Sequence, residues 1–191
     1  SGVNVEILEK VVKAVSQEDI EFVLFTGDLV YGHSDRKIRG DKGALKRLEQ
    51  ELMLFRNTME PIYGKDIPVY CVRGNHSATQ RYPDNASHSD HRPIWPESKK
   101  IWDKVMSGKY GMPHNGPERE KNVTFSATHQ NAMILGLDLY TPNLDSAANL
   151  DGSYPKDACR RVNQEWLDQQ LKTKSEHVFV FTHEPAFKVQ H

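Results

Sequence analysis

The chain has 191 residues, with 25 basic and 26 acidic side chains and a formal net charge of -1. This balance gives no electrostatic case for binding nucleic acid or an anionic membrane, so an anionic substrate would have to be held locally. No stretch approaches the roughly 18 consecutive apolar residues of a membrane-spanning helix. The length suits one core of ordinary size, and we therefore expect a single domain over residues 1–191.

The N-terminal half of the sequence predicts a helix followed by a β-α-β unit. Apolar residues recur at helical spacing over about the first sixteen residues. A strand predicted over residues 20–26 leads into Gly27-Asp28. A longer amphipathic helix then stops near Pro61, and a second strand over residues 67–73 completes the unit.

The C-terminal half begins with a polar stretch that follows Gly74-Asn75-His76. Residues 77–96 are rich in Ser, Asp, Asn, His and Pro and lack periodicity, which predicts a long functional loop. The remaining predicted elements are, in chain order, a short helix over 95–106, neighbouring strands over 122–127 and 132–140, a helix over 157–172 and a final strand over 177–182.

The two cysteines indicate packing rather than chemistry. Cys71 lies in the second predicted strand and Cys159 in the last predicted helix. Two cysteines so placed fit neither a disulfide scaffold nor a Cys-x-x-Cys metal site. We expect both thiols to pack in the interior.

Polar strings stand at the ends of three apolar, strand-like runs. They are Gly27-Asp28, Gly74-Asn75-His76 and His183. In open α/β sheets, ligands collect outside the carboxyl ends of the strands, where loops from separate strands converge. A carboxylate, an amide oxygen and an imidazole form a mixed ligand set that suits Mn, Fe, Zn or Mg. The sequence thus predicts a metal site, although each short string taken alone is also a common turn.

His76 is the candidate catalytic residue. Its neighbour Asn75 would bring an imidazole next to the metal without requiring that it bind the metal. Such a histidine can donate a proton to a leaving oxygen or stabilise charge on a phosphoryl group. The alternative is an ordinary surface histidine on a loop.

Together these residues resemble the calcineurin-like metallophosphoesterases over nearly the whole chain. The resemblance implies an α/β fold, an αββα sandwich with a two-metal site. It implies that Asp28 bridges the metals, that Asn75 and His183 bind the second metal, and that His76 is catalytic. Gly27-Asp28-Leu29-Val30-Tyr31 also resembles the Gly-Asp-x-x-Tyr of purple acid phosphatases, whose tyrosine binds ferric iron. Ser77, however, replaces the glutamate usual in that branch.

Two departures from the family pattern limit the expected site. No Asp-x-His occurs in the chain, and no Gly-His-x-His follows His183. Of the ligands that the family pattern gives the first metal, only Asp28 would be present. The second metal would have Asp28, Asn75 and His183 as ligands. We expect a truncated form of the domain, incomplete at both ends, with at most one strong metal site. Loss of a central strand would also leave an exposed sheet edge.

The resulting hypothesis is that the complete form hydrolyses phosphate esters with a metal-activated water, acting on a small molecule or a phosphoprotein. The rival is a non-catalytic metal-binding or interaction domain that retains the fold. Metal identity, oligomeric state and compartment stay open, although similarity to exported bacterial phosphatases favours a periplasmic or extracellular location. Weaker candidates are His88-Ser89-Asp90-His91 as a metal or phosphate site, and glycosylation sequons at Asn85 and Asn122.

Overall fold

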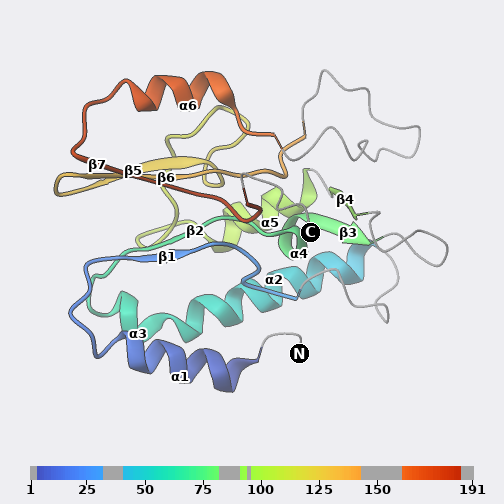
Figure 1. Cartoon of the computed structure of the whole chain (residues 1–191). Coiled ribbons are helices and arrows are strands. Elements are labelled where there is room, and N and C mark those ends of the chain that lie inside the picture. The colour runs from blue at the N-terminus through green and yellow to red at the C-terminus, as the bar shows by residue number, and fades with distance from the viewer. Residues whose placement is uncertain (1–3, 32–40, 82–90, 94–95, 143–160, 186–191) are drawn as a thin grey trace, which may run out of the picture.

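The computed structural model describes residues 4–31, 41–81, 91–93, 96–142 and 161–185. Figure 1 shows four layers. Helix α6 (Gln164–Leu171) covers a three-stranded sheet, a two-stranded sheet lies against that sheet, and helices α1 (Val5–Val15) and α2 (Asp41–Thr58) cover the other side. This is the α/β sandwich that the sequence predicts.

The two-stranded sheet confirms the predicted β-α-β unit. Strand β1 (Val23–Phe25) pairs in parallel with β2 (Val69–Cys71), with Val23 opposite Val69 and Phe25 opposite Cys71. Helix α2 and the short helix α3 (Glu60–Tyr63), which has Pro61 in its first turn, form the crossover. Both strands are shorter than their apolar runs. Cys71 is free and buried, as expected, and burial raises the pKa of its thiol.

The three-stranded sheet combines both pairing directions. Strand β5 (Phe125–His129) runs antiparallel to β6 (Ala132–Gly136), and β6 runs parallel to β7 (His177–Phe181). The parallel pair aligns Ala132 with His177 and Gly136 with Phe181. The residues that follow β1, β2 and β7 meet, because His183 contacts Thr26 after β1 and Asn75 after β2.

Strand β6 is an unbroken apolar run because both of its faces are covered. Ile134 packs in the main core between the two sheets. Met133 and Leu135 alternate with it and pack against Trp166 of α6. Strands buried on both faces characteristically lack the polar alternation of half-exposed strands.

Helical periodicity correctly predicted the faces that enclose this core. Asn4 caps α1 by accepting a hydrogen bond from the backbone N–H of Ile7 at 3.2 Å. Along α2, Leu48, Leu52 and Phe55 are buried in the core cluster. Helix α5 (Glu97–Val105) packs on α2 through the fully buried Trp102. The indole Nε1–H of Trp102 donates to the backbone carbonyl of Asn122 at 2.9 Å.

The prediction of a continuous loop over residues 77–96 was wrong in part. Helix α4 (Asn75–Ala78) is followed by β3 (Thr79–Arg81), which pairs antiparallel with β4 (His91–Pro93). This pairing joins backbone groups of two three-residue strands, which are too short for side-chain alternation to be visible in the sequence.

Among the described strands, only β6 is paired on both sides, so each sheet has open edges. Strand β1 pairs only with β2, and β7 pairs only with β6 among those strands. On β7, Val178, Phe179 and Val180 are exposed. Open, apolar edges favour association with other strands, so self-association through such an edge is a prediction of this structure. None of the described helices combines the length and apolar character needed to cross a membrane.

Core packing along α2 gives a direct test of this fold. Leu52 is fully buried and its neighbour Met53 is 50% exposed. We expect Leu52→Ala to lower the free energy of unfolding by about 2–5 kcal/mol, because it removes packed methyl groups and leaves a cavity. Met53→Ala on the same helix should change it by less than about 0.5 kcal/mol. Urea denaturation of the two variants measures the difference, and equal losses would contradict the assigned helix face.

Candidate metal and catalytic site

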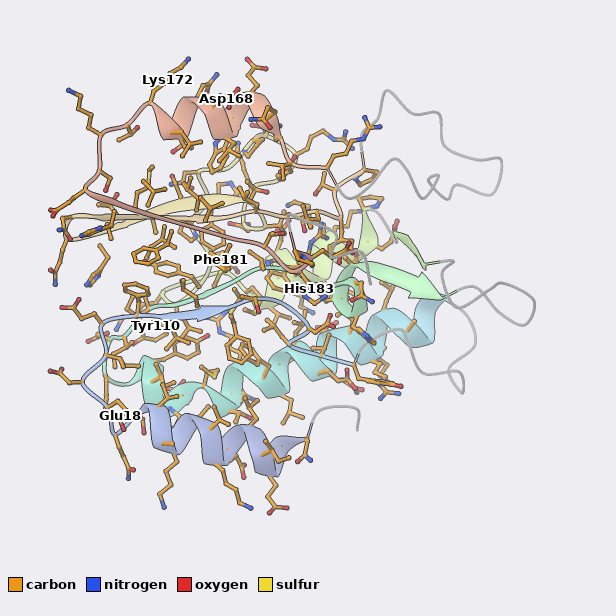
Figure 2. The ribbon with its side chains drawn as sticks, viewed as in Figure 1. Glu18, Tyr110, Asp168, Lys172, Phe181 and His183 are labelled. Carbon is orange, nitrogen blue, oxygen red and sulfur yellow. The ribbon has the colours of Figure 1, made fainter. Side chains whose placement is uncertain are left out.

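The ends of β1, β2 and β7 bring three predicted ligands together. Asp28 follows β1, Asn75 follows β2 and His183 follows β7. The Nε2 atom of His183 lies 3.0 Å from Oδ1 of Asn75 and 3.5 Å from Oδ2 of Asp28. Figure 2 shows His183 beyond the end of β7, close to α4. Two sheets therefore contribute to one site.

Glycines allow the loops after β1 and β2 to approach so closely. Gly27 and Asp28 both have positive φ, +98° and +49°, which makes a sharp turn directly off the strand. A Cβ atom on Gly27 would lie 2.6 Å from Nδ1 of His183. A Cβ atom on Gly74 would overlap the Asp28 carboxylate. Glycine at position 27 is thus favoured by contact as well as by backbone conformation, whereas at position 74 contact alone requires it.

The hydrogen bond of His183 to the β1 loop orients its ring. Nδ1 of His183 donates to the backbone carbonyl of Thr26 at 2.8 Å. A neutral imidazole that donates through Nδ1 presents a lone pair at Nε2. That lone pair faces the amide oxygen of Asn75 and the carboxylate of Asp28, which are also acceptors. Three electron-pair donors converge at one point, which is the chemistry of a cation site.

The rings of His76 and His183 both approach Oδ2 of Asp28. The backbone N–H of His76 donates to Oδ1 of Asp28 at 3.2 Å, and its ring Nδ1 donates to the backbone carbonyl of Tyr31 at 2.9 Å. This leaves Nε2 as the ring atom nearest the carboxylate, 3.8 Å from Oδ2. The His76 ring is therefore held in a fixed tautomer beside Asp28.

Comparison with known proteins identifies the family. A family model described as calcineurin-like phosphoesterase matches residues 3–191. The chain belongs to the calcineurin-like phosphoesterases. A search of curated proteins finds no match to the chain. Membership in this family indicates a metal-dependent phosphoesterase, a hydrolase acting on phosphate esters.

The donor set fits one cation of the kind that calcineurin-like phosphoesterases use. In the described part of the chain, no group of three or more His, Cys, Asp or Glu side chains is placed to hold a metal ion. The set assembled here consists instead of one carboxylate, one imidazole and one amide oxygen. Such a mixed oxygen and nitrogen set suits Mn, Fe or Zn.

Ser77 has a structural role in the turn that carries Asn75. Its hydroxyl donates to the carbonyl of Gly74 at 3.0 Å and accepts from the Gly74 N–H at 3.1 Å. Ser77 is buried, so it closes the turn from inside. The ring of Tyr31 lies against that of His76, with centroids 5.4 Å apart, and Tyr31 remains 45% exposed. A role for Tyr31 as an iron ligand stays a prediction.

Three residues around the site were missed in the sequence. Arg73 and Asp138 form a buried ion pair behind it, and the Tyr140 ring centroid lies 6.3 Å from that of His183. Burial raises the pKa of Tyr140, and its hydrogen bond to Glu184 acts in the same direction. A signal was present: Arg73 and Asp138 are charged residues inside otherwise apolar runs, which indicates a buried pair.

Several weaker sequence candidates lie outside the described residues or have another role. His88, Ser89, Asp90, Asn85 and Cys159 fall within ranges 82–90 and 143–160, which the structure does not describe. Asn122 of the second sequon is buried, and its side chain contacts His114 and Asp103. Its positive φ of +67° and these contacts make Asn122 a structural residue.

Replacing Gly27 tests whether its close contact with the His183 ring leaves no room for a side chain at position 27. Gly108 is the matched control, because it also has positive φ (+86°) but a Cβ there would come no closer than 3.7 Å to another atom. Both Ala variants should lose about 1–2 kcal/mol of unfolding free energy from backbone strain. Gly27→Ala should lose more and should also shift the imidazole NMR signals of His183. Equal stability losses with unchanged His183 signals would contradict the contact.

Proposed function

We propose that this chain hydrolyses phosphate esters at the site formed by Asp28, Asn75, His76 and His183, with one divalent cation held by Asp28, Asn75 and His183. The observation that carries the proposal is the convergence of acceptor atoms on Nε2 of His183, 3.0 Å from Asn75 and 3.5 Å from Asp28. Family membership supplies the reaction class, phosphoester hydrolysis. Mn, Fe and Zn are the candidate metals.

The chain's own residues would bind and orient the reactants. A cation bound there would supply Lewis acidity, which lowers the pKa of water and offsets negative charge on phosphoryl oxygens. Asp28 contributes the negative charge that favours a cation, and the Thr26 carbonyl keeps the Nε2 lone pair of His183 turned toward it. Asn75, the first residue of α4, adds a neutral oxygen from beyond the end of β2.

His76 would donate the proton that the leaving oxygen of the ester needs. Its Nδ1–H is fixed on the Tyr31 carbonyl, so proton exchange with a substrate must use Nε2. The histidine ring is partly exposed, at 26% of its side-chain surface, and can be reached by a bound ester. Once protonated, Nε2–H can donate to the leaving oxygen of the ester, the role of a general acid. Nε2 lies 3.8 Å from Oδ2 of Asp28, so this proton donor stands beside the proposed cation ligands.

Variants of these residues separate binding from catalysis. The substrates are 4-nitrophenyl phosphate and bis(4-nitrophenyl) phosphate with added Mn²⁺, and calorimetry gives the Mn²⁺ affinity. We expect His76→Ala to lower kcat at least about 100-fold, the smallest usual effect of losing an acid–base group, with little change in affinity. Asn75→Ala should weaken Mn²⁺ binding by about tenfold or more, because it removes a ligand.

A histidine on the same strand provides the control. His177 stands at the start of β7, is exposed and lies at the opposite end of that strand from His183. His177→Ala should leave both turnover and Mn²⁺ affinity unchanged. If the natural chain binds Mn²⁺ but hydrolyses neither ester, the non-catalytic alternative holds. If Mn²⁺ does not bind, or if His76→Ala turns over normally, the proposed site is wrong.

A further inference from the structure

A buried ion pair joins the two sheets behind the proposed site. Arg73 directly precedes Gly74 on the β2 side, and Asp138 lies two residues beyond β6. The guanidinium binds the carboxylate through two hydrogen bonds, Nε to Oδ1 at 2.9 Å and Nη2 to Oδ2 at 2.6 Å. Both side chains are 0% exposed. Such a two-point contact fixes orientation as well as distance.

The Asp138 end of the pair is itself held rigidly. Its Oδ2 accepts from the Thr141 backbone N–H at 2.8 Å and from the Thr141 hydroxyl at 2.7 Å. Its own backbone N–H donates to the Thr124 hydroxyl oxygen at 3.0 Å, and that hydroxyl donates to Glu120 at 2.6 Å. A carboxylate with this many partners has little freedom to move, so Arg73 is attached to a fixed point.

The same short segment also reaches the β7 side of the site. Tyr140, two residues after Asp138, has its ring centroid 6.3 Å from that of His183. The Tyr140 hydroxyl donates to Oε1 of Glu184, the residue after His183, at 2.9 Å. Residues 138–141 therefore contact the Asn75 loop through Arg73 and the His183 loop through Tyr140.

A contribution to folding stability is a weak explanation for the buried Arg73–Asp138 pair. Charges taken out of water carry a desolvation cost that their attraction does not reliably exceed, and apolar replacements of both partners are often neutral or stabilising. The Asn75 loop, in contrast, has almost no positional tolerance, since Gly74 already contacts Asp28. The pair stands one residue from that contact.

We propose that residues 138–141 act as a template in which Arg73–Asp138 and Tyr140–Glu184 set the distance between Asn75 and His183, and through it the affinity for the cation. Arg73, Asp138 and Tyr140 are positioning residues, because they act through the ligands rather than on the substrate. The inference deepens the proposed function and rests on it for the identity of the ligand.

The test removes the pair without leaving a lone buried charge. Arg73→Met combined with Asp138→Leu should keep the chain folded in urea denaturation. We expect Mn²⁺ affinity, measured by calorimetry, to fall about 10- to 100-fold, the usual effect of losing residues that orient metal ligands. In the metal-free chain, the backbone N–H of His76, which donates to Asp28, should exchange with solvent at least about tenfold faster as the loop loosens.

Two further variants make the result decisive. Lys109→Met combined with Asp66→Leu removes an exposed ion pair, next to Tyr110 and away from His183 in Figure 2, and should change neither readout. Tyr140→Phe keeps the buried ring, loses the bond to Glu184 and should weaken Mn²⁺ binding about tenfold. If the double variant does not fold, the Mn²⁺ affinity of Tyr140→Phe alone tests the proposal. The proposal would be overturned if Tyr140→Phe bound Mn²⁺ with the natural affinity. It would also be overturned if the double variant folded and kept both the natural Mn²⁺ affinity and the natural exchange rate of the His76 N–H.

Failure of the proposed function would give a different set of results in these experiments. A natural chain that does not bind Mn²⁺ would refute the metal site, whatever the variants do. The exchange rate of the His76 N–H in the metal-free chains would still test positioning, because that measurement needs no cation. Slow exchange in the natural chain and fast exchange in the double variant would support the template; equal rates would overturn it.

Discussion

The site depends on the absence of side chains at Gly27 and Gly74. Two parallel strands end side by side, and their loops can share a cation only if their backbones come within direct contact of the groups that bind it. At Gly27 the neighbour is the ring of His183, and at Gly74 it is the carboxylate of Asp28. A methyl group at either position would separate the ligands. Backbone geometry thus orders the proposed ligands in the metal-free chain, which would lower the ordering cost of binding a cation.

The site also depends on the packing of one sheet upon the other, because its ligands come from both. Phe125 of β5 packs against Tyr70 of β2 and against Phe181 of β7, with ring centroids 5.9 Å and 6.1 Å apart. Phe181 is the last residue of β7 and stands two residues before His183, so this aromatic contact holds the end of β7 against the core (Figure 2). A cation that bridges the sheets would bind only the folded chain and would stabilise it in turn.

The sequence was informative about features that a single periodicity or the end of a single strand determines. Helical spacing predicted α1 and α2, and the polar strings predicted that Asp28, Asn75 and His183 meet, since strand ends gather at one edge. It failed for β3 and β4, which are too short for a periodicity to be visible, and where partners are far apart in the chain. Arg73 and Asp138 are separated by 65 positions, and only folding reveals that they bind each other.

The most direct test is a crystal of this chain grown with Mn²⁺ and measured at the manganese absorption edge. We expect one anomalous difference peak within coordination distance of the Asp28 carboxylate, the Asn75 amide oxygen and Nε2 of His183. We also expect His183 to keep its Nδ1 bond to the Thr26 carbonyl. No peak at saturating Mn²⁺, or a peak elsewhere with these side chains still in mutual contact, would contradict the central claim that they form a cation site.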